Sequence, residues 1–89
     1  GIFAGNAVAT AKLRFTPERA RWVGAESWHP HQRGEYEPDG SYLLRVPYAD
    51  DRELIMDILR YGADCEVVGP KSLRDAVRRE LREAAARYA

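Results

Sequence analysis

Apolar and polar residues alternate along the chain from Ala7 to Phe15. The apolar residues fall mainly on one parity, and Thr10, Lys12 and Arg14 fall on the other. A period of two is typical of a strand that buries one face and exposes the other. We therefore expect a half-buried strand in this region.

A short helix and a second strand are predicted next. Thr16 has the character of an N-cap and Pro17 that of a first helical residue, so we expect a helix over residues 17–25. Residues 27–36 predict a strand, with Trp28 and Tyr36 on one parity. Pro30 within this run has no N–H for a sheet hydrogen bond, which favours an edge strand.

The second half of the chain repeats this pattern of strand, helix and strand. Asp39-Gly40 predicts a hairpin turn into a strand over residues 41–48. Apolar residues at helical spacing then predict a helix that is capped by Asp50 or Asp51 and ends at Gly62. A short strand is expected over residues 64–68.

A third helix is predicted after Pro70. Its apolar stripe consists of Leu73, Val77, Leu81, Ala84 and Tyr88. Oppositely charged residues four positions apart favour a helix, and they form a ladder of Asp75, Arg79, Glu83 and Arg87 on another face.

This order of elements predicts an α+β fold class. Strand, helix, strand, strand, helix and strand form the ferredoxin-like βαββαβ sandwich, an antiparallel four-stranded sheet with two helices on one face. Here a C-terminal helix follows it. The topology places the first and third strands in the centre of the sheet and the second and fourth at its edges. A chain of 89 residues suffices for one such domain but not for a deep catalytic cavity as well.

The composition limits the classes of partner and compartment. The formal net charge is zero, so overall basicity gives no argument for binding nucleic acid or a membrane. No apolar run approaches the roughly 18 residues of a membrane span. The single cysteine, Cys65, excludes an internal disulfide and fits a reducing, cytoplasmic location. The start at Gly1, without an initiator Met, leads us to expect a piece of a longer protein.

Motifs for catalysis, cofactors and metals are absent from the sequence. It contains no Gly-rich phosphate loop, nucleophile elbow or HExxH helix, so we expect neither an enzyme nor a cofactor. Cys65 lies at an apolar position and is interpreted as a small buried hydrophobe. His29 and His31 would share a strand face, but no third ligand is apparent, so no metal site is predicted.

Basic side chains are predicted to gather on the sheet face away from the helices. The candidate anionic-effector surface consists of Lys12, Arg14, His31, Arg33 and Arg45. An alternative is an ordinary solvated face with ion pairs to Glu35, Glu37, Asp64 and Glu66. Both interpretations stay open. Base stacking of the kind used by RNA-recognition domains is disfavoured, because Phe15, Tyr42 and Tyr48 fall on the buried parity.

Several motifs occur in order from Ala7 to Tyr88. They are Leu13 to Ala20, Trp28-His29-Pro30-His31-Gln32, Asp39-Gly40-Ser41, Arg52 to Gly62, and Glu66 to Arg74. In these motifs the chain resembles the C-terminal extension, or WCX domain, of WYL-domain transcriptional regulators. The elements from Trp28 to Gln32 and from Gly62 to Arg74 are the most specific parts of the resemblance.

The resemblance implies a bacterial protein with an N-terminal winged helix-turn-helix that binds promoter DNA, a WYL barrel that senses a ligand, and this extension. Residues 1–6 would be a linker or the tail of the barrel, and residues 7–89 the WCX domain. The effector of some such regulators is nucleic acid, including single-stranded DNA. The WCX domain is implied to adopt a ferredoxin-like fold and to support dimer formation and effector response. Its matched residues transfer only as fold markers: Trp28, Pro30, Gly62, Pro70 and Leu73.

Three functional hypotheses follow. The first is a regulatory and oligomerisation domain of a bacterial transcription factor. Its expected partners are a second copy of the chain, the barrel and helix-turn-helix of the same parent chain, and a nucleic-acid or phosphate-bearing effector. No binding to a membrane is expected. The second is a purely structural dimerisation module. The third, a small-molecule-binding regulatory domain, is disfavoured because no Gly-rich ligand loop lies at a strand–helix junction.

Overall fold

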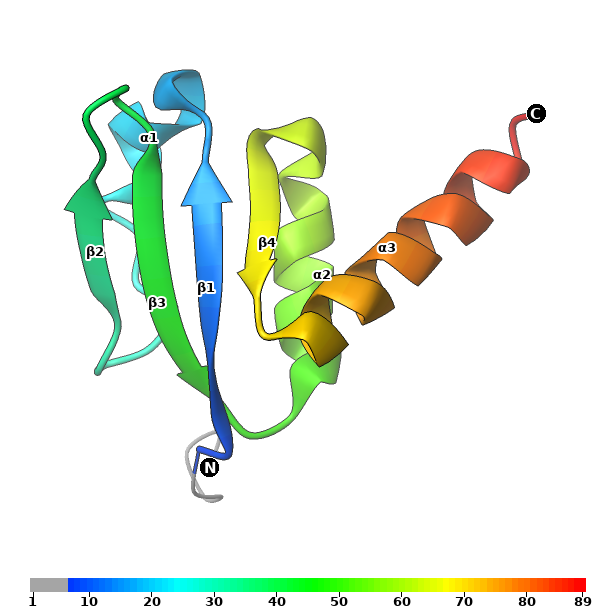
Figure 1. Ribbon diagram of the computed structural model, residues 1–89, viewed down its shortest axis with the longest axis horizontal. Coiled ribbons are helices and arrows are strands. Elements are labelled where there is room, and N and C mark those ends of the chain that lie inside the picture. The colour runs from blue at the N-terminus through cyan, green and yellow to red at the C-terminus, as the bar shows by residue number, and fades with distance from the viewer. Residues whose placement is uncertain (1–6) are drawn as a thin grey trace.

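Residues 7–89, which the computed structural model describes, form one antiparallel sheet and three α-helices (Figure 1). The elements, in chain order, are β1 (Ala9–Phe15), α1 (Pro17–Val23), β2 (Arg33–Tyr36), β3 (Tyr42–Tyr48), α2 (Asp51–Arg60), a 3-10 turn (Gly62–Asp64), β4 (Cys65–Gly69) and α3 (Lys71–Ala86). The prediction for residues 1–6 concerns positions outside this range. None of the helices in residues 7–89 has the length and apolar character of a transmembrane span.

The strands of the sheet lie in the order β2-β3-β1-β4, all antiparallel to their neighbours. This order confirms the prediction that the first and third strands are central and the second and fourth lie at the edges. Leu13 lies opposite Leu44, and Lys12 lies opposite Arg45. The sheet therefore has one apolar face and one face that carries charged side chains.

The core lies between the apolar face of the sheet and the helices. Leu13, Phe15 and Leu44 are fully buried there, as the alternation of the sequence predicts. Each helix contributes buried side chains to the same cluster, namely Ala20, Val23, Leu54, Ile58, Leu73 and Val77. Full burial of one large apolar side chain stabilises a fold by about 1.5–3 kcal/mol. This cluster is thus the main source of stability.

The helix boundaries follow from local hydrogen bonds. The hydroxyl oxygen of Thr16 accepts a hydrogen bond from the backbone N–H of Arg19 at 3.3 Å. Asp50 accepts one from the N–H of Arg52 at 2.9 Å. Both residues are therefore N-caps, as predicted. Gly62 has a φ of +56°, which glycine adopts without strain, and α2 ends just before it.

The predicted second strand is too long. Residues 27–32 form a loop, and β2 comprises only Arg33–Tyr36. The side-chain oxygen of Gln32 accepts hydrogen bonds from the N–H groups of Trp28 and His29, at 2.5 and 3.0 Å. Its amide nitrogen donates to the carbonyl of Glu26 at 2.8 Å. A side chain that satisfies the backbone in this way competes with a sheet ladder.

Pro30 lies in the exposed turn of this loop, so the prediction that it belongs to an edge strand is wrong. The loop is held against the core by Trp28, whose ring stacks on Tyr61 with the centroids 5.7 Å apart. The same ring meets Phe15 edge-on at 5.9 Å. Trp28 thus contributes apolar area from a loop rather than from a strand.

Helix α3 leaves the body of the domain after its first two turns (Figure 1). Leu73 and Val77 are buried, whereas every residue from Arg78 onward is exposed. The predicted charge ladder is wrong, because none of its ion pairs forms within the described residues. Lys71 instead pairs with Asp75 at 2.9 Å. Exposed pairs at this spacing contribute only about 0.3–0.5 kcal/mol each, so little stability depends on which of them forms.

We expect Gly34→Ala to destabilise the domain. A Cβ atom at this position would lie 1.8 Å from the hydroxyl oxygen of Tyr42, whose ring rests on the Gly34 backbone. Overpacking of this kind costs about 1–3 kcal/mol, measured as the free energy of unfolding in urea. Gly24→Ala is the matched control, because its Cβ would make contacts no closer than 3.4 Å. Equal stability of the two variants would contradict this account of the edge strand.

Candidate anion-binding surface

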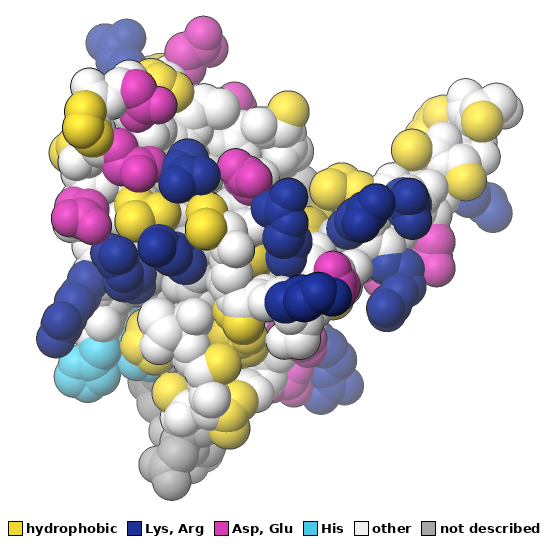
Figure 2. Space-filling model, viewed as in Figure 1, with side chains coloured by type: hydrophobic (Ala, Val, Ile, Leu, Met, Phe, Trp, Pro, Cys, Tyr) yellow, Lys and Arg dark blue, Asp and Glu magenta, His cyan; other side chains and the backbone are white. Residues whose placement is uncertain are grey.

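Three basic residues lie directly opposite one another across three strands of the open sheet face. Lys12 of β1 faces Arg45 of β3, and Arg45 faces Arg33 of β2. We call these three residues the cation row. Adjacent strands are about 4.8 Å apart, so the row extends over about 10 Å. Figure 2 shows Lys and Arg side chains in a band across this part of the face.

The cation row is only partly neutralised. Arg45 donates to Glu35 at 3.0 Å. Within residues 7–89, neither Lys12 nor Arg33 forms an ion pair or a side-chain hydrogen bond. Like charges directly opposite one another on a sheet are destabilising. An anion bound between these side chains would relieve that repulsion.

Arg14 belongs to a different part of the face. Its Nε donates to Glu37 at 2.8 Å, and its Nη1 lies 3.6 Å from Glu66. The hydrogen bond from Arg14 lowers the pKa of the Glu37 carboxyl, and one from Ser41 adds to the effect. Arg14 is thus held by carboxylates, and the solvated-face interpretation describes it well.

The neighbours of Arg14 in register extend this neutral region. Arg14 lies opposite Leu43, which in turn lies opposite Glu35. Leu43 is only 5 % exposed although it is on the open face. Long charged side chains cover apolar neighbours with their aliphatic stems. The open face therefore divides into a neutralised region around Arg14 and the less neutralised cation row beside it.

His31 does not lie on the sheet. It is an exposed residue of the loop before β2, and its backbone N–H donates to Nδ1 of His29 at 2.9 Å. The histidines lie at the border of the face, next to the band of basic side chains (Figure 2). Among the described residues, no group of three metal-ligating side chains comes together. His31 is thus separate from the cation row that the strand register aligns.

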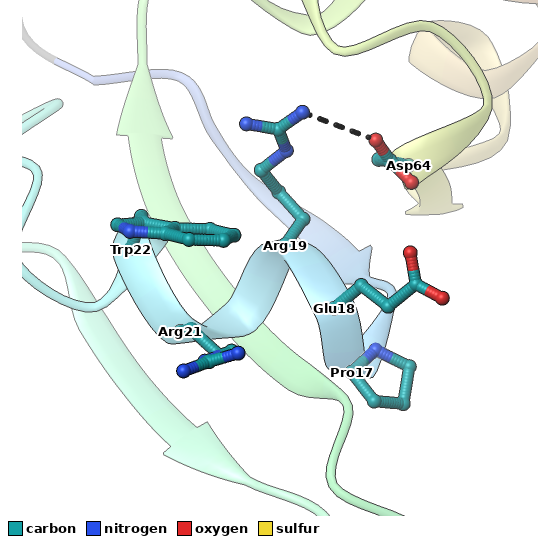
Figure 3. Close-up of a pocket in the computed structure, with 6 residues that line it drawn as sticks. All are labelled: Pro17, Glu18, Arg19, Arg21, Trp22 and Asp64. Carbon is teal, nitrogen blue, oxygen red and sulfur yellow. Dashed lines mark hydrogen bonds and ion pairs between the residues drawn. The ribbon is translucent and has the colours of Figure 1, made fainter.

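A shallow pocket of about 530 Å³ lies on α1, on the helix side of the sheet (Figure 3). It is lined by Pro17, Glu18, Arg19, Arg21, Trp22 and Asp64. Figure 3 shows Arg19 directed from α1 toward Asp64, with the atoms Nη2 and Oδ2 3.4 Å apart. The guanidinium of Arg19 also lies 5.9 Å from the ring centroid of Trp22 and 5.8 Å from that of Tyr61.

This pocket was not predicted. The signal for it is Arg19-Ala20-Arg21-Trp22, which places a tryptophan and two arginines on a helix of only seven residues. Trp22 is 57 % exposed, because Ala20 and Val23 turn the helix toward the core. Two arginines and two carboxylates balance within the pocket, so it offers stacking surface but no excess charge for an anion.

The fold markers other than Pro30 take defined structural positions. Gly62 adopts its left-handed conformation after α2, and Leu73, 1 % exposed, anchors α3 in the core. The peptide bond between Gly69 and Pro70 is cis and directly precedes α3. These residues shape the chain and do not line the cation row.

The family model described as WCX domain matches residues 7–85. No protein of curated function matches the chain. The matched region includes every strand of the sheet and most of α3.

We expect Cys65 to be unreactive in the native state. Burial, with a contribution from Glu66, raises the pKa of its thiol to about 12. Alkylation by iodoacetamide at mildly alkaline pH should be at least about 100-fold slower in buffer than in concentrated urea, since the thiolate is the reacting species. Added glutathione serves as a control for the reagent. Similar rates for Cys65 under the two conditions would indicate an accessible thiolate and reopen the question of a nucleophile.

Proposed function

Because the chain belongs to the WCX domain family, we propose that it is the regulatory C-terminal domain of a bacterial, cytoplasmic WYL-type transcriptional regulator. The helix-turn-helix and the WYL barrel then belong to other parts of the parent chain. The domain itself is not an enzyme and acts by binding and association. Its strand order, with two helices over one sheet face, supports a ferredoxin-like assignment for the fold.

Within this role, the open sheet face binds an anionic, phosphate-bearing effector. The observation that supports it is the cation row, in which Lys12 and Arg33 lack a carboxylate partner and Arg45 lies between them. Arginine guanidinium groups match the oxygens of a phosphate with paired hydrogen bonds, and lysine supplies a point charge. A bound phosphate would supply the negative charge that the row lacks.

A single-stranded nucleic acid fits the row better than a free phosphate ion does. The row extends over about 10 Å, which is longer than one phosphate group. The aromatic residues of the sheet face the core, as Tyr42 and Phe15 do, so contacts to the backbone of the strand would dominate. Backbone contacts position a nucleic acid without reading its sequence. The proposed binding is therefore salt-dependent and tolerant of base sequence.

A structural dimerisation module is the second candidate function. The exposed apolar side chains of Leu81 on α3 and of Tyr88 in the turn after it favour it, because they extend a buried stripe into solvent. Dimerisation and effector binding use different parts of the domain and can coexist in one regulator.

The test reverses the charge of the two unpaired members of the row. Lys12→Glu with Arg33→Glu should raise the Kd for a fluorescent single-stranded oligonucleotide by at least about tenfold and reduce the slope of log Kd against log salt by about 1.4, for two lost phosphate contacts. The binding of inorganic phosphate, measured in parallel, separates a free ion from a strand as the ligand.

The matched control is Arg21→Glu with Arg60→Glu, which changes the net charge equally but lies on α1 and α2. An equal loss of affinity in this control would show that only the overall charge matters. An unchanged salt slope in the Lys12 and Arg33 variant would overturn the proposed surface.

A further inference from the structure

The second half of α3 is not packed against any other part of the described chain. From Arg78 to the C-terminus every residue is exposed, including Leu81 at 47 % and Tyr88 at 92 %. Arg87 caps the helix and Tyr88 continues it as a turn, with its N–H donating to the carbonyl of Ala85 at 3.0 Å. In Figure 1 this segment leads away from the sheet.

The apolar residues of α3 and of the turn that follows it repeat with the spacing of a helix–helix seam. Val77, Leu81, Ala84 and Tyr88 are separated by four, three and four positions. This is the a and d pattern of a heptad, in which apolar residues face a second helix. Val77 already closes the core of its own domain at 7 % exposure, so the free part of the seam begins at Leu81.

We propose that α3 pairs antiparallel with α3 of a second copy of this chain. This inference rests on the proposed dimerisation and names the surface that carries it. In such a pair Leu81 packs against the partner's Ala84, and Tyr88 lies beside the partner's Val77. Leu81 thus meets a small residue, which allows close approach of the two helices.

The charges beside the seam select the antiparallel orientation. Glu80 and Arg87 are seven positions apart, so they occupy equivalent positions on one flank. In the antiparallel pair Glu80 lies beside the partner's Arg87, and two-fold symmetry repeats this contact. In a parallel pair Glu80 would instead lie beside the partner's Ala85. Within the described residues neither Glu80 nor Arg87 has an ion-pair partner in its own chain.

The residues on the opposite flank of the seam are also compatible with an antiparallel pair. Arg78 and Ala85 occupy it, and the antiparallel pair brings each Arg78 beside the partner's Ala85. No like charges meet. The helix pair is short, and specific interfaces generally bury about 1,200 Å² or more, so we expect a dimer that dissociates on dilution.

Sedimentation velocity over a series of concentrations tests the seam. Wild type should show a concentration-dependent dimer. Glu80→Arg and Arg87→Glu should each raise the dimer Kd by at least about tenfold, because each places like charges together at both symmetric contacts. The double variant should return to within about threefold of wild type, since it restores both pairs with their signs exchanged.

Two controls keep the outcome decisive. Arg82→Glu alters the charge of α3 away from the seam and should leave the dimer Kd unchanged, whereas Leu81→Glu should abolish dimerisation. A monomeric wild type at all concentrations, or a double variant no better than the single ones, would overturn the proposal. Oligonucleotide binding by the same variants separates the two proposals, because the seam can fail while the cation row still binds.

Discussion

The pairing of β1 with β3 is the constraint on which the rest of the domain depends. β1 is central and hydrogen-bonded on both sides, so its register determines what each sheet face carries. The pairing that buries Leu13 opposite Leu44 also sets Lys12 opposite Arg45. A slip by one residue would expose Leu13 and bury Lys12, which the core could not tolerate. The cation row is therefore fixed in place by the apolar core behind it.

The charged groups of the domain differ in how they are compensated. Arg14 forms ion pairs with Glu37 and Glu66, and Arg19 of α1 forms one with Asp64. These two arginines are therefore already neutralised within the fold. Within the described residues, Lys12 and Arg33 form no ion pair, and neither do Glu80 and Arg87 at the exposed end of α3. A domain of zero formal net charge thus keeps uncompensated groups at two separate surfaces, one suited to an anion and one to a second copy.

The sequence predicted those features that depend on local pattern. Three such features were confirmed: the alternation of β1, the helix caps at Thr16 and Asp50, and the turn at Gly62. Each of them follows from neighbouring residues. The loop before β2 could not be predicted, because the Gln32 amide replaces the strand hydrogen bonds expected there. The sequence named Glu37 and Glu66 among the possible ion-pair partners on the open face, but that both contact Arg14 depends on how the strands come together. The protrusion of α3 depends on where the core ends. Both are properties of the assembled fold.

The most direct test of the central claim is an amide chemical-shift titration of the domain with a short single-stranded oligonucleotide, followed by NMR. Backbone amides of Lys12, Arg33 and Arg45 and their neighbours on β1, β2 and β3 should shift together with one affinity that weakens as salt increases. Residues of α1 around Trp22 should not move. Shifts confined to α1, or no shifts at low salt, would contradict the account.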